Sequence, residues 1–202
     1  MAYQDDIKKA AALLLPWNKL SGCNILVTGA TGLIGGCLVD VLMAHKGRNY
    51  NVYASGRNEE RAGRRFLKYA DDNSFHFVKY DVAHPLEYDV NFQYIIHAAS
   101  GAYPEEFIKH PVEVIKGNIN GVDNLMGYGI QHGIKRLLYI SSGEVYGEGD
   151  GRVFTENYSG YVDCTSLRSC YPSSKRAAET LCISYGAEYG IDVVIALSLI
   201  HI

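Results

Sequence analysis

A tyrosine and a lysine four residues apart carry the clearest chemistry in this 202-residue chain. Residues 171–175 read Tyr-Pro-Ser-Ser-Lys and are followed by helix-forming residues. Positions i and i+4 share one helix face, so the phenol of Tyr171 and the ammonium of Lys175 can converge on one substrate. A free tyrosine has a pKa of about 10, and a nearby cation lowers that pKa. We therefore expect Lys175 to activate Tyr171 as a general base.

Further polar residues follow an apolar run at 138–147, which reads Leu-Tyr-Ile-Ser-Ser-Gly-Glu-Val-Tyr-Gly. Ser141 and Ser142 stand where a strand should end, so a hydroxyl there can hydrogen-bond a substrate oxygen. Glu144 lies two residues further on. It is either an acid–base group of the same site or a surface carboxylate that caps or pairs.

Three glycines in the segment Thr-Gly-Ala-Thr-Gly-Leu-Ile-Gly, residues 28–35, indicate a phosphate-binding loop. The segment follows an apolar strand and opens a helix, whose N-terminus supplies free amides and positive potential. Gly29 permits the tight turn, Gly32 lets the backbone approach a pyrophosphate, and Gly35 lets the helix pack closely on the sheet. The loop residues expected to bind a dinucleotide are Gly29, Thr31, Gly32, Leu33, Ile34 and Gly35.

The second strand ends without the acidic residue that normally holds the adenosine ribose of NAD. Arg57 follows that strand and could pair with a 2'-phosphate, so the sequence predicts NAD or NADP with a slight preference for NADP. Asp81 and Val82 close the third strand beside the expected adenine, although an aspartate at such a turn is often only a cap. The small residues Ala98 and Ala99 follow the fourth strand and leave room for the cofactor.

Runs rich in Val, Ile and Tyr alternate with amphipathic stretches, which predicts an α/β fold with a doubly wound parallel sheet of Rossmann type. The expected strands are Asn24–Thr28, Tyr50–Ser55, Phe75–Tyr80, Tyr94–Ala98, Arg136–Ser141 and Asp192–Leu197. The expected helices are Leu33–His45, Glu59–Tyr69, Pro111–Gln131 and Pro172–Glu188.

Residues 1–23 are expected to form a helical extension to a dinucleotide-binding domain over residues 24–202. Within Asp5–Leu20, an amphipathic helix should bury Ile7, Ala11, Leu14 and Leu15 and end at Pro16. It would cover a sheet edge or helix face, or make a subunit contact.

Composition and charge exclude several classes of partner. The net charge is -3 and the basic residues form no stripe, so we expect no nucleic-acid partner. The apolar runs are too short to span a bilayer and the N-terminus is acidic, so we expect no membrane contact and a cytoplasmic location. The five cysteines form no C-x-x-C pair, which argues against a disulfide framework or a metal site. They are Cys23, Cys37, Cys164, Cys170 and Cys182.

Taken together, these motifs make the chain resemble the extended short-chain dehydrogenase/reductases, and within them the NAD-dependent epimerase/dehydratase family of nucleotide-sugar enzymes. The likeness runs from Asn24 to about Ala196. It implies that Tyr171 is the base and that Lys175 is its activator and a ribose ligand. It also implies that Ser142 is the hydroxyl partner and that Asn118 is a helix-kinking fourth member. His97, at the end of the fourth strand, is expected to be a packed residue rather than a base.

In that family the cofactor takes a hydride from sugar C4 and returns it, by way of a 4-keto intermediate. The 4,6-dehydratases carry an Asp-Glu pair after the serine, whereas this chain has Gly143 and Glu144. A lone Glu resembles the UDP-glucuronate decarboxylases, as do the segments 97–100 and 110–118. The alternatives are a dTDP-glucose 4,6-dehydratase or a 4-epimerase, and, from another class, a non-catalytic NAD(P)-binding sensor or an inactive fragment.

Family members continue past the sixth strand into a smaller substrate domain, whereas this sequence stops there. The last six residues, Leu-Ser-Leu-Ile-His-Ile, match the translation of a transposon end used in sequencing libraries. We expect residues 197–202 to be foreign and the full-length protein to be a homodimer that binds a nucleotide sugar.

Overall fold

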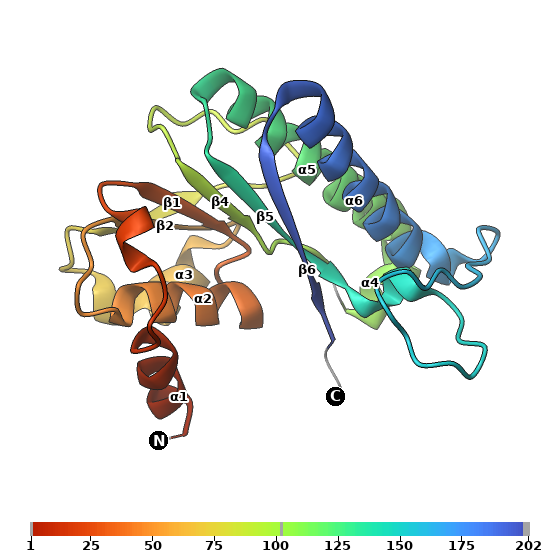
Figure 1. Ribbon diagram of the computed structural model, residues 1–202, viewed down its shortest axis with the longest axis horizontal. Coiled ribbons are helices and arrows are strands. Elements are labelled where there is room, and N and C mark those ends of the chain that lie inside the picture. Colours follow the sequence, from red (N-terminus) through yellow and green to blue (C-terminus); the bar gives the residue numbers. More distant parts are fainter. Residues whose placement is uncertain (1, 102, 200–202) are drawn as a thin grey trace.

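Six parallel strands form one sheet in the order β3-β2-β1-β4-β5-β6 (Figure 1). The computed structural model describes residues 2–101 and 103–199. The strands are β1 (Asn24–Thr28), β2 (Asn51–Gly56), β3 (Phe75–Lys79), β4 (Tyr94–His97), β5 (Arg136–Ser142) and β6 (Asp192–Ser198). The strand order turns back between β1 and β4, and such a switch point opens a crevice at the carboxyl ends of the strands. This arrangement confirms the α/β, doubly wound prediction.

Helices cover both faces of the sheet (Figure 1). One face packs on α2 (Leu33–Ala44) and α3 (Glu59–Phe66), and the other on α5 (Pro111–His132) and α6 (Cys170–Tyr189). Side chains alternate along a strand, so neighbouring residues of β1 enter different cores. Ile25 and Val27 join the α2–α3 core, whereas Leu26 joins the α5–α6 core.

Local sequence accounts for where several helices begin and end. The side chain of Asn58 caps α3 by accepting a hydrogen bond from the Arg61 amide at 2.8 Å. Gly133 and Gly190 end α5 and α6 in the left-handed conformation, with φ of 64° and 72°, which glycine adopts without strain. Each predicted strand bound lies within one residue of the observed one. The predicted helix Glu59–Tyr69 changes after Phe66 into the 3-10 helix Leu67–Tyr69.

The N-terminal helix is shorter than predicted. α1 spans Ala2–Ala11 and buries only Ile7 and Ala11, while Leu14 is fully exposed and Leu15 is half exposed. Proline disfavours helical geometry at the residue before it, which accounts for the non-helical Leu15 but not for the earlier end of α1 at Ala11. The prediction that Leu14 and Leu15 lie on a buried face is therefore wrong. A 3-10 helix, Trp17–Leu20, leads into β1.

α1 packs against α2 rather than against a sheet edge. The Tyr3 hydroxyl donates to Asp40 of α2 at 2.6 Å, and the Ala11 carbonyl lies 3.1 Å from Nδ1 of His45. A subunit contact by α1 stays a prediction.

Two short segments that the sequence did not predict lie next to the site described below. The helix α4 (Pro104–Lys109) precedes α5, and the 3-10 helix η4 (Leu167–Ser169) leads directly into α6. A third short 3-10 helix, η3 (Gly143–Tyr146), follows β5.

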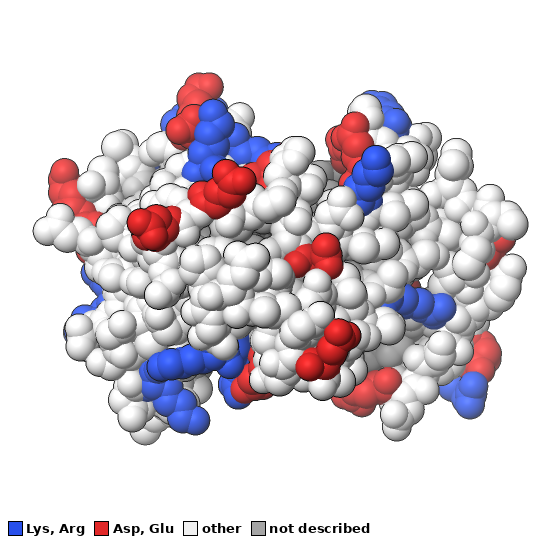
Figure 2. Space-filling model, turned by 90° about the horizontal axis from the view of Figure 1, so that it is seen from above, with Lys and Arg blue, Asp and Glu red and all other residues white. Residues whose placement is uncertain are grey.

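Of the six C-terminal residues predicted to be foreign, 200–202 lie outside the described residues. Leu197 and Ser198 continue β6 opposite Ser141 and Ser142 of β5. Acidic and basic side chains are interspersed on the face shown in Figure 2. Within the described ranges, none of the helices combines the length and the apolar character needed to cross a membrane.

Candidate active site

The glycine loop between β1 and α2 is packed too tightly for larger residues. Gly29 has φ +65°, and a Cβ there would lie 2.6 Å from the carbonyl oxygen of Ala98. A Cβ on Gly35 would lie 2.4 Å from the Gly29 carbonyl oxygen. Gly32 is the N-cap of α2 and has an extended conformation. A glycine there lets the backbone approach a ligand closely and is not needed for a positive φ. The cradle therefore brings bare backbone to the N-terminus of α2, as a pyrophosphate requires.

The other residues predicted to bind a dinucleotide gather around this loop. Ala98 and Ala99 touch Gly29, and Thr31 lies beside Gly56 at the end of β2. Leu33 and Ile34 form the first turn of α2, and Leu33 is 76% exposed at the crevice.

Arg57 and Asp81 stand together after β2 and β3, where the adenosine is expected. An Nη1 of Arg57 lies 3.9 Å from Oδ2 of Asp81, and the arginine side chain is 78% exposed. Asp81 also caps its own turn by accepting from the Ala83 amide at 3.1 Å. The carbonyl of Val82 accepts from Asn124 of α5 at 2.9 Å, which fixes the turn against the helix.

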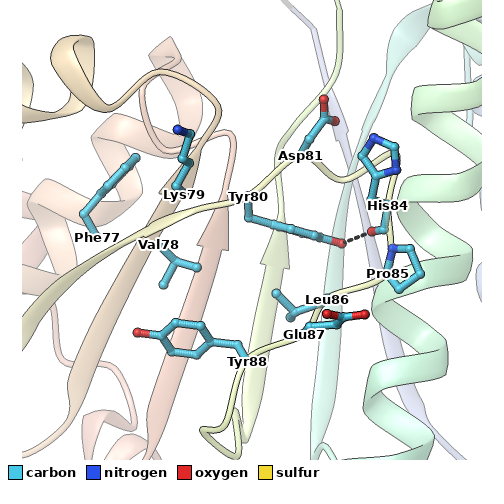
Figure 3. Close-up of a pocket in the computed structure, with 10 residues that line it drawn as sticks. All are labelled: Phe77, Val78, Lys79, Tyr80, Asp81, His84, Pro85, Leu86, Glu87 and Tyr88. Atoms are coloured by element: carbon cyan, nitrogen blue, oxygen red, sulfur yellow. Dashed lines mark hydrogen bonds between the residues drawn. The ribbon is translucent and has the colours of Figure 1, made fainter.

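A cavity of about 410 Å³ lies between β3 and the segment 84–88 that folds beneath it (Figure 3). The Tyr80 hydroxyl donates to the His84 carbonyl at 2.9 Å and closes one side. Val78 points to the opposite side of β3 from Phe77 and Lys79 (Figure 3). Asp81 lines this cavity, whereas Tyr171 and Lys175 do not, so the cavity is separate from the tyrosine–lysine pair.

Tyr171 and Lys175 lie in the first turns of α6, and both are buried, with 7% and 2% exposure. The Lys175 ammonium donates to the Ile140 carbonyl at 2.9 Å and lies 4.6 Å from the ring centroid of Tyr139. Burial lowers the pKa of Lys175 to about 8, and the carboxylate of Glu179 opposes that change.

The pKa of Tyr171 is raised, not lowered as the sequence predicted. Burial is the largest cause, and hydrogen bonding with the Ser142 hydroxyl is the largest opposing one. The Lys175 ammonium bonds the Ile140 carbonyl and lies over the Tyr139 ring in this arrangement. Activation of Tyr171 by Lys175 stays a prediction.

Ser142 ends β5 on the side of Tyr171, and its hydroxyl accepts from the Glu144 amide at 3.3 Å. Ser141 is buried, and its hydroxyl has no partner among the described residues. Successive strand residues point to opposite faces, so only one of the two serines can serve Tyr171. Ser142, not Ser141, is among the groups that lower the pKa of Tyr171, and its role as the hydroxyl partner stays a prediction.

Asn118 is fully buried in α5 and connects two serines that the sequence did not single out. Its amide donates to the Ser174 hydroxyl at 2.9 Å, and its carbonyl oxygen accepts from the Ser100 hydroxyl at 2.8 Å. Ser100 is also among the groups that lower the pKa of Tyr171. α5 runs without interruption through Asn118, and a kink there stays a prediction.

Glu144 forms an ion pair with Arg168 of η4, at 2.6 Å between Oε1 and Nη2. The glutamate side chain is 38% exposed, so it reaches solvent as well as the site. The charge of Glu144 raises the pKa of Tyr171. The structure thus shows Glu144 as a pairing carboxylate, and its role as an acid–base group of the site stays a prediction.

His97 is the packed residue that the sequence predicted. Its side chain is 1% exposed, and Nδ1 lies 2.8 Å from the Thr28 hydroxyl. Burial, reinforced by the charge of Lys175, lowers the pKa of His97 to about 3. The imidazole is thus neutral at physiological pH.

Comparisons with known proteins agree with this geometry. The model of the NAD dependent epimerase/dehydratase family matches residues 25–198. UDP-glucuronic acid decarboxylase 6 of Arabidopsis thaliana is 36% identical over 87% of this chain, which spans 50% of that protein. UDP-glucuronic acid decarboxylase 1 of Danio rerio is 33% identical over 85% of this chain, which spans 40% of it. The chain thus spans about half or less of the curated relatives named here.

Among solved structures, dTDP-glucose 4,6-dehydratase DesIV of Streptomyces venezuelae, with NAD and TYD bound, aligns with a TM-score of 0.71. It is 22% identical, and the match covers 86% of this chain and 55% of that one. At this identity the likeness supports the fold alone. The family match covers most of the sequence and both motifs, and on that ground the chain belongs to the NAD dependent epimerase/dehydratase family.

Proposed function

We propose that the complete protein converts UDP-glucuronate to a UDP-pentose through a 4-keto intermediate, with NAD or NADP as the redox cofactor. The observation that carries the proposal is the cluster of Tyr171, Ser142 and Glu144 at the end of β5, with Gly143 in place of a second acid. The two curated relatives described above are UDP-glucuronic acid decarboxylases, which supports the same substrate.

The glycine cradle fits a dinucleotide, because a Cβ at Gly29 or Gly35 would clash with neighbouring backbone and open the tight turn that a pyrophosphate approaches. When bound, the nicotinamide supplies a hydride acceptor and donor. Tyr171 would take the proton from the sugar O4, while Ser142 hydrogen-bonds the same oxygen. Lys175 would hold the ribose of the cofactor once its ammonium leaves the Ile140 carbonyl.

The missing acid at Gly143 favours decarboxylation for a chemical reason. Dehydration must expel a hydroxyl from C6, and a general acid has to protonate that leaving group. A 4-keto-glucuronate is a β-keto acid, which loses CO₂ without a protonated leaving group. The electron pair left at C5 then takes up a proton. A site with one carboxylate, Glu144, is therefore sufficient for these two reaction steps.

Product analysis on the complete protein tests the reaction. UDP-glucuronate should give CO₂ and a UDP-pentose. Tyr171→Phe should slow turnover roughly 10²- to 10⁴-fold and leave cofactor affinity nearly unchanged, because the phenol acts in the transition state. Formation of a 4-keto-6-deoxy sugar from dTDP-glucose would show that the enzyme is a dehydratase rather than a decarboxylase. Turnover by Tyr171→Phe at the parent rate would show that Tyr171 is not the base.

We further propose that NADP binds at least as well as NAD. Arg57 is exposed at the end of β2 and its only ion pair in the described residues, with Asp81, is long at 3.9 Å, so the guanidinium is free to meet a 2'-phosphate. Asp81 would then lie beside the adenine. A homodimer and a cytoplasmic location stay predictions.

Calorimetric titration of the 202-residue chain with both nucleotides tests this preference. Arg57→Ala should weaken NADP binding about tenfold and leave NAD binding unchanged, as expected for the loss of one exposed charge-assisted contact. Gly35→Ala should abolish binding of both, whereas Gly63→Ala should not, because a Cβ at Gly63 of α3 meets nothing within 4 Å. A clear preference of the parent for NAD would contradict the role of Arg57.

A further inference from the structure

A series of side-chain contacts leads from Glu144 to Tyr171 through two residues that sequence motifs did not reveal. Arg168 Nη2 lies 2.6 Å from Glu144 Oε1. The guanidinium carbon of Arg168 lies 4.7 Å from the ring centroid of Phe107. The Phe107 ring in turn stacks on Tyr171, with centroids 4.7 Å apart and planes inclined by 24°.

Three short segments hold these side chains in place. Glu144 belongs to η3, Arg168 to η4 and Phe107 to α4. Phe107 is 2% exposed, and its carbonyl accepts a weak hydrogen bond from the Cys170 thiol at 3.7 Å. This contact fixes α4 against the first turn of α6. The stack on Tyr171 is therefore part of a packed core rather than a mobile surface contact.

The charges of Glu144 and Arg168 act on the pKa of Tyr171 in opposite directions. Glu144 raises the pKa of Tyr171, and Arg168 lowers it. A carboxylate beside a tyrosine base disfavours the phenolate, so the site has a need for a compensating cation. Arg168 supplies this positive charge without bonding the Tyr171 phenol, because its guanidinium hydrogen-bonds Glu144 and lies over the Phe107 ring.

The other groups around Tyr171 do not duplicate this effect. The hydroxyls of Ser142 and Ser100 lower the pKa of Tyr171 by hydrogen bonding, without charge. The Lys175 ammonium lies 5.8 Å from the Tyr171 ring centroid and bonds the Ile140 carbonyl. The Tyr139 phenol, on β5, is neutral because burial raises its pKa.

We propose that Arg168 is a positioning residue that holds the Glu144 carboxylate beside Tyr171 while offsetting its charge on the phenol. The role in turnover rests on the proposed function, since it gives Glu144 and Tyr171 their tasks. The planar guanidinium matters as well as the charge: it pairs with the carboxylate and stacks on Phe107, which a lysine ammonium cannot do in the same way.

The titration of Tyr171 in the 202-residue chain tests this role without any turnover. Tyrosines are replaced by 3-fluorotyrosine, whose phenol is more acidic, and the ¹⁹F signal of Tyr171 is assigned with Tyr171→Phe. Arg168→Met should move the titration of Tyr171 to higher pH, and Glu144→Gln should move it to lower pH. The double variant should lie between them, and Arg168→Lys should recover part of the shift.

Arg152 supplies a matched control. It pairs with Asp150 at 2.6 Å and lies 5.6 Å from the Tyr158 ring centroid, so it makes the same two kinds of contact in a surface loop. Arg152→Met should leave the Tyr171 titration unchanged. An unchanged titration in Arg168→Met, or an equal shift in Arg152→Met, would overturn the proposal.

The complete protein supplies the second readout. There, Arg168→Met should move the pH–rate profile in the same direction as the ¹⁹F titration. If the ¹⁹F shift appears but no UDP-pentose forms from UDP-glucuronate, the proposed reaction fails while the coupling of Arg168 to Tyr171 stands. A ¹⁹F shift with an unmoved pH–rate profile in an active enzyme would overturn the positioning role.

Discussion

The half of the molecule on the α2–α3 face of the sheet buries a charged side chain that has several hydrogen-bond partners. Asp40 of α2 is completely buried and accepts hydrogen bonds from Tyr3 at 2.6 Å, Arg65 at 2.5 Å and Tyr69 at 2.9 Å. Lys68 adds an ion pair at 2.9 Å. Burial alone would raise the pKa of Asp40, but these partners together lower it to about 2. The carboxylate thus joins α1, α2 and α3 as an ionised hub.

The half of the molecule on the α5–α6 face of the sheet buries polar atoms that lack hydrogen-bond partners. Of the five such side-chain atoms found in the described residues, four lie in β4, β5 or α6. They are His97 Nε2, Tyr139 Oη, Ser141 Oγ and Glu179 Oε1. The fifth is the hydroxyl of Ser55 at the end of β2.

An unpaired buried polar group destabilises a fold, so a cluster of them in one half needs a reason. Proteins keep such groups where function requires them and rely on the remaining structure for stability. The comparison teaches that the Asp40 hub is scaffold, whereas the unpaired groups surround Lys175 and the proposed site. Substitutions in the first half should therefore destabilise the fold, and some in the second should stabilise it.

The largest effect is expected for Asp40→Ala. It leaves Arg65 and Lys68 without their carboxylate, and removing one partner of a buried pair costs about 3 kcal/mol where the other partners keep some access to water. Urea unfolding measures the loss. Glu60→Gln is the control, since its pair with Arg64 is about three-quarters exposed and should contribute almost nothing.

The hub also predicts acid sensitivity. The pKa of Asp40 is about 2 in the fold and 3.8 in its ordinary state, so its stabilisation is complete above pH 4 and is lost as pH falls through 2. This window is worth roughly 2 kcal/mol. Asp40→Ala should lack that part of the acid transition. A parent whose stability between pH 4 and 2 follows that of Asp40→Ala would show that Asp40 is not the ionised hub.

Lys175→Met is expected to stabilise the fold, whereas Asp40→Ala destabilises it. The pKa of Lys175 is about 8 in the fold against 10.5 ordinarily, so the unfolded chain binds a proton that the folded chain lacks between these values. Stability due to Lys175 therefore rises as pH increases from 8 toward 10.5. At pH 7, Lys175→Met should stabilise the fold by about 2 kcal/mol, allowing for the Ile140 carbonyl that loses its donor.

Chemical unfolding at several pH values checks the prediction for Lys175→Met. The gain from Lys175→Met should shrink between pH 8 and 10, and Lys46→Met, at an exposed position, should be neutral at both. Destabilisation by Lys175→Met at pH 7 would place Lys175 with the paired groups and break the comparison.

The elements and motifs that the sequence predicted are those set by local pattern. The apolar runs gave all six strands, and the glycine spacing gave the cradle that Gly29 and Gly35 form. Tyr171 and Lys175 were predicted because i and i+4 residues share a helix face.

What the sequence did not predict depends on packing between distant segments. Phe107 belongs to a helix of six residues, which is too short for a periodic signal, and its stack on Tyr171 spans 64 positions of the chain. The pKa of Tyr171 was predicted in the wrong direction because burial and the direction of the Lys175 side chain are tertiary properties. Leu14 and Leu15 fit a helical period, yet the helix ends at Ala11 and neither side chain is buried.

The smallest effect is expected for Tyr139→Phe, which separates the two contributions of that side chain. The hydroxyl of Tyr139 is buried without a partner, while the ring lies 4.6 Å from the Lys175 ammonium. Tyr139→Phe removes the buried hydroxyl that has no hydrogen-bond partner and keeps the ring, so the free energy of unfolding should rise by up to about 1 kcal/mol. Tyr139→Leu should instead destabilise it by about 2 kcal/mol, because the cavity and the lost cation–π contact add. Thermal and urea unfolding of the two variants measure these changes side by side. Destabilisation by Tyr139→Phe as large as that by Tyr139→Leu would mean that the hydroxyl is hydrogen-bonded in solution, and the contrast between the two halves would then rest on His97, Ser141 and Glu179 alone.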